Sequence, residues 1–253
     1  MIRHVLLSTL LLWCGEARAV VLDWSNVSWT AGSLSNSYEL DSTNPGSDIT
    51  VSISGDTGTL TGGTPVIDNT LPGGTSPADS SLRMQVDLAN HSQQITVTIT
   101  FNYPSLVDNA SFKLFDIGNN GMNSQDQIRS IIGTDGTTQF AATISNVGSA
   151  IQLAGSGLSQ TLTGISSPPP GGAGAVQGTA TIDFGTNKVN QITFTYGSGP
   201  SANANPSAQQ ITLFDISFTP AVPEVGSSFC ALSVCLFLLL TERRRKPTAR
   251  LSA

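Results

Sequence analysis

The residues best suited to bind a ligand are acidic and amide side chains in the middle of the chain. The segment 116–121 reads Asp-Ile-Gly-Asn-Asn-Gly, and Asp126 follows five residues later. It partly matches a calcium-binding loop, which has an acidic residue first, an oxygen ligand fifth and glycine sixth. Its third position, however, is glycine, and Gln127 replaces the closing glutamate. We therefore expect Asp116, Asn120 and Asp126 to form either a weak calcium site or a solvated hairpin turn. No motif requires any other cofactor.

The sequence contains few residues that are suited to catalysis. His91 is the one histidine between residues 20 and 220, and no Gly-x-Ser-x-Gly motif is present. The three cysteines, Cys14, Cys230 and Cys235, lie near the two ends, which excludes a disulfide framework or zinc–thiolate site from the body. Paired aspartates could in principle hydrolyse glycosides. Aromatic residues that could stack on sugars are nevertheless sparse, so we expect no enzymatic activity.

The charge of the body restricts its partners. Between residues 20 and 220 the sequence holds fourteen acidic and four basic residues, a formal charge of −10. Nucleic acids and anionic lipids both require a positive surface, so neither is an expected partner. Serine, threonine, asparagine and glycine supply most of the polar surface, and the abundance of threonine favours β-structure.

The first nineteen residues have the layout of a secretory signal. Arg3 provides a basic start, residues 5–13 are mostly apolar, and Ala17-Arg18-Ala19 offers small residues at a cleavage site. We predict that signal peptidase removes residues 1–19 and that the protein is exported.

A second predicted targeting segment lies at the C-terminal end of the sequence. Residues 225–240 are mostly apolar, and Arg243, Arg244, Arg245 and Lys246 follow. Sixteen helical residues extend about 24 Å, slightly less than the roughly 30 Å of a hydrocarbon core, and long arginines can cover the difference. The sequence thus predicts a transmembrane helix at about 225–241, with a basic tail (243–250) on the cytoplasmic side.

Val222-Pro223-Glu224 precedes this hydrophobic segment. The order of motif, hydrophobic helix and arginine-rich tail resembles the PEP-CTERM sorting signal of Gram-negative bacteria, over about the last thirty residues. Val225 replaces the second proline of that motif. The resemblance implies recognition by an exosortase, a membrane processing enzyme, and export linked to exopolysaccharide production. The segment would then be either a transient sorting address or a lasting single-pass anchor in the cell envelope.

Between the two ends, apolar and polar residues alternate with a period of two. Along 94–101, apolar residues occupy every second position and polar residues, mostly threonine, fill the others, a pattern typical of an antiparallel strand with one buried face. Further strands are predicted at 21–29, 49–53, 82–88, 111–117, 127–132, 138–144, 150–153, 175–184, 189–194 and 211–218. About a dozen short strands predict an all-β fold, an antiparallel β-sandwich of jelly-roll type. The predicted organisation is a signal peptide (1–19), a β-sandwich ectodomain (20–220) and a sorting or anchor segment (221–253).

Leu-Phe-Asp-Ile occurs twice, at 114–117 and 213–216. This repeated sequence is explained if both segments are strands in similar environments of one core. An alternative places Asp116 and Asp215 near each other as oxygen ligands. Trp24 and Trp29, predicted on one strand, would point to opposite faces and form no single aromatic platform.

Three functions are compatible with these features. The first is a non-catalytic surface or extracellular-matrix protein, associated with exopolysaccharide or biofilm. The second is a carbohydrate-binding module, which calcium could stabilise. The third is a secreted glycoside hydrolase that uses paired aspartates. The expected partners are signal peptidase, an exosortase-like enzyme and extracellular polysaccharide.

Overall fold

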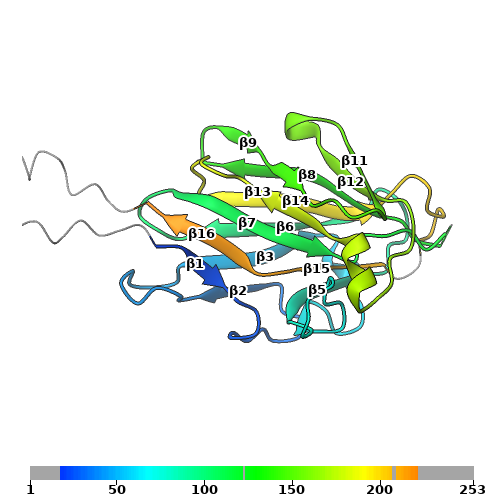
Figure 1. The fold of residues 1–253 in the computed structure, drawn as a ribbon, viewed down its shortest axis with the longest axis horizontal. Coiled ribbons are helices and arrows are strands. Elements are labelled where there is room, and N and C mark those ends of the chain that lie inside the picture. Colours follow the sequence, from blue (N-terminus) through cyan, green and yellow to red (C-terminus); the bar gives the residue numbers. More distant parts are fainter. Residues whose placement is uncertain (1–17, 122, 207–208, 222–253) are drawn as a thin grey trace, which may run out of the picture. The chain divides into compact units, whose positions relative to one another are not determined.

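Two antiparallel β-sheets form the body of the protein, as seen in a computed structural model that describes residues 18–121, 123–206 and 209–221 (Figure 1). The first sheet, sheet A, contains β1 (Val20–Leu22), β4 (Val66–Asp68), β5 (Ser81–Val86), β7 (Val107–Phe115), β10 (Thr143–Ser145), β13 (Ala180–Asp183), β15 (Gln209–Leu213) and β16 (Ile216–Pro220). The second, sheet B, contains β2 (Ser35–Tyr38), β3 (Ile49–Gly55), β6 (Gln94–Phe101), β8 (Asp126–Thr134), β9 (Gln139–Ala141), β11 (Ile151–Ala154), β12 (Thr161–Gly164) and β14 (Gln191–Ser198). The predicted all-β sandwich of antiparallel sheets is confirmed.

The order of strands shows how the chain alternates between the sheets. Sheet A runs β1-β16-β7-β15-β5-β4, with β13 pairing β7 and β10 pairing β13. Sheet B runs β11-β12-β8-β14-β6-β3-β2, with β9 beside β8. From β5 to β8 each successive strand lies in the other sheet.

The hydrophobic core lies where the alternating sequence predicts it. In β6 the residues Ile95, Val97, Ile99 and Phe101 are buried, whereas the threonines between them are partly exposed. Phe112 and Phe194 stack in this core with ring centroids 5.8 Å apart. Each such side chain contributes roughly 1.5–3 kcal/mol by its burial. Residues 18–221 therefore contain a core of their own, and a fragment covering 20–221 is expected to fold alone.

Several predicted strand bounds are wrong. The range 21–29 is a strand only as far as Leu22, 138–144 is divided between β9 and β10, and 211–218 is divided between β15 and β16. In the range 175–184, residues up to Gly178 belong to the 3₁₀ helix η3 (Ala173–Gly178). Two further 3₁₀ helices, η1 (Thr57–Thr59) and η2 (Gly157–Ser159), lie in connections.

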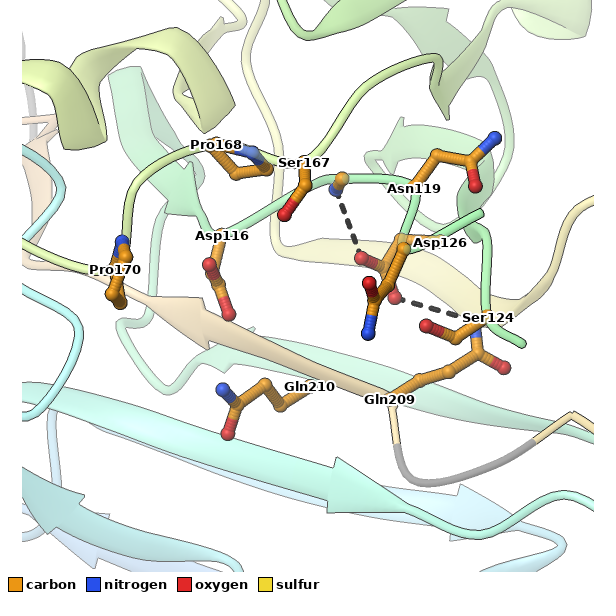
Figure 2. Close-up of a pocket in the computed structure, with 11 residues that line it drawn as sticks. Asp116, Asn119, Ser124, Asp126, Ser167, Pro168, Pro170, Gln209 and Gln210 are labelled. Carbon is orange, nitrogen blue, oxygen red and sulfur yellow. Dashed lines mark hydrogen bonds between the residues drawn. The ribbon is translucent and has the colours of Figure 1, made fainter. Parts of the chain in front are cut away.

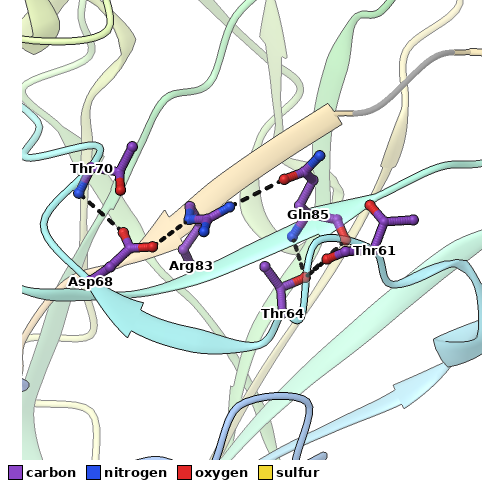
Figure 3. Close-up of polar contacts among 6 residues, drawn as sticks. All are labelled: Thr61, Thr64, Asp68, Thr70, Arg83 and Gln85. Carbon is purple, nitrogen blue, oxygen red and sulfur yellow. Dashed lines mark hydrogen bonds and ion pairs between the residues drawn. The ribbon is translucent and has the colours of Figure 1, made fainter.

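Polar contacts hold the edge strand β4 to β5 on the outer side of sheet A. The Nε atom of Arg83 lies 2.7 Å from Oδ2 of Asp68, and its Nη1 donates to Oε1 of Gln85 at 3.1 Å (Figure 3). The backbone N–H of Gln85 in turn donates to Oγ1 of Thr64. This network compensates for the small number of backbone pairs that a three-residue strand can make.

No helix within the described ranges is long and apolar enough to cross a membrane. The hydrophobic segment 225–241, the Val222-Pro223-Glu224 motif and the basic tail all lie outside the described residues, as do residues 1–17 of the predicted signal.

Candidate functional site

A polar cavity of about 280 Å³ lies where β7 ends and where β8 and β15 begin (Figure 2). Asp116 follows the last residue of β7, Asp126 begins β8, and Gln209 and Gln210 begin β15. The remaining walls come from the loop between β7 and β8 and from the proline-rich loop after β12, through Gly118, Asn119, Asn120, Ser124, Ser167, Pro168 and Pro170. The fold therefore places Asp116, Asn120 and Asp126 among the residues that line one cavity.

Asp126 is the most buried charged group of the cavity. It is 7% exposed, and its Oδ1 accepts hydrogen bonds from the Tyr196 hydroxyl at 2.6 Å and from Nε2 of Gln209 at 3.3 Å. Its Oδ2 accepts the backbone N–H of Gly118 at 2.9 Å. Burial raises the pKa of Asp126 to about 7, and the three hydrogen bonds oppose this rise by stabilising the carboxylate.

Asp116 stands on the opposite wall of the cavity, and its side chain is only partly buried. Its backbone has a φ of +63°, a left-handed conformation that aspartate and asparagine adopt more readily than most residues. Burial raises the pKa of Asp116 to about 6, while the side chain of Gln210 lowers it. Repulsion from the Asp116 charge contributes to the raised pKa of Asp126.

The connection between Asp116 and Asp126 is a hairpin-like turn fixed by backbone hydrogen bonds. The N–H of Asp126 donates to the carbonyl of Gly118, and the N–H of Asn120 donates to that of Ser124, each at 2.9 Å. The N–H of Asn119 reaches the carbonyl of Ser166, which ties this turn to the proline-rich loop. The hairpin turn expected from the sequence is thus present.

Two oxygens beside this cavity have no hydrogen-bond partner in the described part of the chain. They are Oδ1 of Asn119 and Oε1 of Gln209, both buried atoms. The described residues contain no group of three or more histidine, cysteine, aspartate or glutamate side chains that could hold a metal. The cavity can therefore offer two carboxylates together with neutral amide and hydroxyl oxygens.

Sequence reasoning missed Gln209 and Gln210 as site residues. Gln209 lies 83 residues after Asp126, and no local motif connects the two positions. The proline-rich segment is expected from its composition to be a loop, but composition carries no sign that it forms a cavity wall. The one signal available is indirect, because Gln209 is a polar residue that precedes an alternating strand.

Sheet B presents a second polar surface on its outer side, here named the hydroxyl face. In β3, β6 and β14, hydroxyl residues pair across the strands, with β6 in the middle: Thr100 pairs with Thr50, Thr98 with both Ser52 and Thr193, and Thr96 with both Ser54 and Thr195. These eight side chains are partly or fully exposed, while the residues between them point into the core. These eight side chains are uncharged, in contrast with the acidic body, and Arg129 of β8 lies beside them, in register with Thr195.

Trp24 and Trp29 are buried in the structure. Trp24 is 1% exposed and Trp29 is 7% exposed, and their rings pack edge to face with centroids 6.3 Å apart. The expectation that they point to opposite faces of one strand is wrong, because β1 ends at Leu22 and a turn follows. Because both rings are buried, they form no exposed aromatic platform. The exposed large hydrophobic residues of the described ranges are all aliphatic.

The two Leu-Phe-Asp-Ile segments lie side by side, but their aspartates do not. Strands β7 and β15 pair antiparallel in sheet A, with Leu114 opposite Leu213, and the rings of Phe115 and Phe214 lie 5.0 Å apart. Because the strands run in opposite directions, Asp116 and Asp215 lie toward opposite ends of the pair. Asp215 instead accepts the backbone N–H of Trp24 at 3.0 Å. The shared environment is confirmed, and the alternative of a joint ligand site is wrong.

His91 lies in the loop between β5 and β6. Its Nε2 contacts the backbone carbonyl of Asn203 at 2.6 Å. This contact is with a carbonyl oxygen rather than with a nucleophile or a carboxylate, and His91 is not among the residues that line the cavity.

Comparison of the sequence with protein-family models finds no match, and neither does comparison with curated proteins. Among solved structures, the chain is similar to CBM27-1 of Caldicellulosiruptor saccharolyticus in complex with mannohexaose (14% identity, 80% of this chain and 97% of that one, TM-score 0.36). It is also similar to the family 11 carbohydrate-binding module of Clostridium thermocellum in complex with a β-1,3-1,4-mixed-linked tetrasaccharide (12% identity, 82% and 99%, TM-score 0.32). A third is the K1 cleaved adhesin domain of Lys-gingipain from Porphyromonas gingivalis (11% identity, 81% and 99%, TM-score 0.33).

Proposed function

We propose that the protein is an exported, non-catalytic surface protein whose β-sandwich binds a neutral extracellular polysaccharide. The observation that carries this proposal is the hydroxyl face of sheet B. Serine and threonine hydroxyls both donate and accept hydrogen bonds, as sugar hydroxyls do. An uncharged array of them on an acidic body suits a neutral polyhydroxyl chain better than an anionic one, which the body would repel.

Binding on this face would depend on hydrogen bonds rather than on aromatic stacking. Trp24 and Trp29 are buried in the core. Each hydrogen bond that replaces one to water contributes only about 0.5–1.5 kcal/mol. Affinity would therefore grow with the number of sugar units in contact, which favours a polymer over a short oligosaccharide.

Substitution of three central hydroxyl residues tests this proposal. The triple variant Thr96→Val, Thr98→Val, Thr193→Val keeps the β-branched shape of each side chain and removes its hydroxyl. Retardation of the 20–221 fragment in native gels containing β-mannan, mixed-linkage β-glucan or galactan would measure binding. We expect the variant to bind at least about tenfold more weakly than the parent fragment.

The matched control is Thr143→Val, Thr181→Val, Thr219→Val, which changes three threonines of sheet A. This control should bind like the parent. Equal retardation of the two triple variants, or no retardation of the parent by any of the three polymers, would contradict the proposal.

A hydrolytic role has one observation in its favour, since Asp116 and Asp126 share a cavity and both have a raised pKa. A general acid must nevertheless reach the bond that it protonates. Asp126 is 7% exposed, and both of its oxygens already accept hydrogen bonds. We therefore assign Asp126 to the structure of the turn rather than to catalysis.

Export and sorting complete the proposal. We infer that signal peptidase removes residues 1–19 and that an exosortase-like enzyme processes the chain near Pro223-Glu224, which leaves the sandwich on the cell surface or in the matrix. The resemblance of the C-terminal segment to PEP-CTERM signals supports this. Mass spectrometry of the protein recovered from the cell envelope should find a C-terminus close to Glu224. A C-terminus at Ala253 would instead identify a lasting membrane anchor.

A further inference from the structure

The chemistry of the cavity walls restricts what can bind there. Of the described residues, eleven line the cavity, and none of these is basic, aromatic or a large aliphatic residue. Carboxyl, amide and hydroxyl groups supply its polar surface, and Pro168 and Pro170 supply apolar surface. An anion would find no cation here, and an aromatic ligand or a lipid would find no large apolar wall. The walls suit a small polar ligand that donates several hydrogen bonds.

Asp116 has hydrogen-bonding capacity that the fold leaves available. Asp126 accepts three hydrogen bonds from the fold, whereas the side chain of Gln210 is the one described group that lowers the pKa of Asp116. An ionised carboxyl group offers about four acceptor positions, so most of those of Asp116 are free. Figure 2 shows this carboxyl group and the hydroxyl of Ser167 directed into the space between the walls.

The separation of the polar groups indicates the size of the ligand. Asp116 and Asp126 lie on opposite walls, so their oxygens do not meet at one point as the ligands of a metal ion would, and Ser124 lies on the side of Asp126 (Figure 2). A ligand that contacts both walls needs hydrogen-bonding groups on opposite edges. The cavity, at about 280 Å³, is close to the lower limit of roughly 300 Å³ for small-molecule pockets. A single sugar ring, with hydroxyl groups around its edge, meets both requirements.

We propose that this cavity binds one terminal sugar unit of an uncharged glycan, at a chain end or on a side branch. Asp116 would accept hydrogen bonds from the sugar hydroxyls, and Ser124, Ser167 and Gln210 would complete the contacts. Hydrogen bonds to a carboxylate are stronger than those between neutral groups, so Asp116 would contribute most. None of the eleven lining residues belongs to the hydroxyl face, so this second site goes beyond the polymer-binding surface proposed above and is tested separately.

Nuclear magnetic resonance titration of the ¹⁵N-labelled 20–221 fragment tests the cavity without any polymer. The probes are methyl β-D-mannoside, methyl β-D-glucoside and methyl β-D-galactoside. At least one should move the amide resonances of residues 116–120 and 209–210 with a saturable Kd of about 1 mM, as expected for a ligand of about thirteen heavy atoms. The resonances of the hydroxyl face should not follow the same curve. Methyl β-D-glucuronide, which adds a carboxylate, should bind at least about fivefold more weakly than methyl β-D-glucoside.

Asp116→Asn is the decisive variant. It removes the charge of the main acceptor, and asparagine tolerates the left-handed backbone of this position, so the variant is expected to fold. It should weaken sugar binding about fivefold or more, and Ser167→Ala, in an exposed loop, should weaken it about threefold. Asp87→Asn, at an exposed position just after β5, should bind like the parent.

The triple threonine variant of β6 and β14 separates this site from the hydroxyl face. It should bind the methyl glycosides like the parent even though it loses polymer binding, and Asp116→Asn should do the reverse. Absence of polymer binding by the parent would contradict the proposed function and leave this site standing. The cavity proposal is overturned if none of the three uncharged glycosides gives saturable shifts at its walls, or if Asp116→Asn binds them like the parent.

Discussion

Replacing Asp126 by alanine is expected to lower the free energy of unfolding by about 4 kcal/mol, one of the two largest effects of any single substitution considered for this chain. The change removes the acceptor of three hydrogen bonds, from Tyr196, Gly118 and Gln209, inside a nearly closed environment. Each buried donor left unpaired costs about 1–3 kcal/mol. Urea unfolding of the 20–221 fragment would measure the loss.

Asp126→Asn should be less harmful, because it retains one oxygen acceptor and the shape of the side chain. It still loses stability, since its new amide group faces the Gly118 N–H, a donor opposite a donor. Asp87→Ala, at an exposed position, should change stability by no more than about 0.5 kcal/mol. A loss below about 1 kcal/mol for Asp126→Ala would show that the network contributes little to the fold.

Gly164→Ala is expected to cost about 3 kcal/mol or more, through a clash between two backbone segments. A Cβ atom at Gly164 would lie 2.0 Å from the carbonyl oxygen of Gly118 and 2.2 Å from its carbonyl carbon. Backbone atoms cannot turn aside as a flexible side chain can, so the end of β12 or the β7–β8 turn must move. The carbonyl of Gly164 also accepts Nε2 of Gln125 at 2.8 Å, a contact that the movement would disturb.

Gly171→Ala is the matched control for this substitution. It lies in the proline-rich loop a few residues later, and nothing lies within 4 Å of its added Cβ. Its stability should stay within about 0.5 kcal/mol of the parent fragment. If both glycine variants unfold at the same urea concentration as the parent, the close approach of the two segments is incorrect.

The fold was predictable wherever a strand has one buried and one exposed face. Residues 94–101 are predicted as a strand and form β6 with the same bounds, because alternation continues to both ends. Strand β2, with the sequence Ser-Asn-Ser-Tyr, was missed because this edge strand is polar at three of its four positions. The segment 211–218 alternates almost without interruption, so its division at Phe214 and Asp215 depends on tertiary contacts such as the Asp215–Trp24 hydrogen bond.

The candidate site was predictable only in part, for a similar reason. Asp116, Asn120 and Asp126 lie within eleven residues, so local spacing alone could group them. Gln209 and the proline-rich loop reach the cavity through the pairing of distant strands, and no short motif encodes such pairing. The sequence also does not show that Asp126 is buried against Tyr196. This contact identifies Asp126 as a structural carboxylate rather than a solvated one.

The position of β16 determines how the sandwich would withstand mechanical force. In Figure 1 this last strand lies between β1 and β7, and both neighbours run antiparallel to it. A pull applied beyond Ala221 acts along β16, so the hydrogen bonds on both of its sides bear the load together instead of opening one at a time. The N–H of Ala221 donates to the carbonyl of Leu106 at 3.2 Å, and its own carbonyl accepts the Ser105 hydroxyl at 2.7 Å, which extends the clamped region. If the chain is held at the cell through its C-terminal side, as we propose, a force along β16 would load these hydrogen bonds in shear.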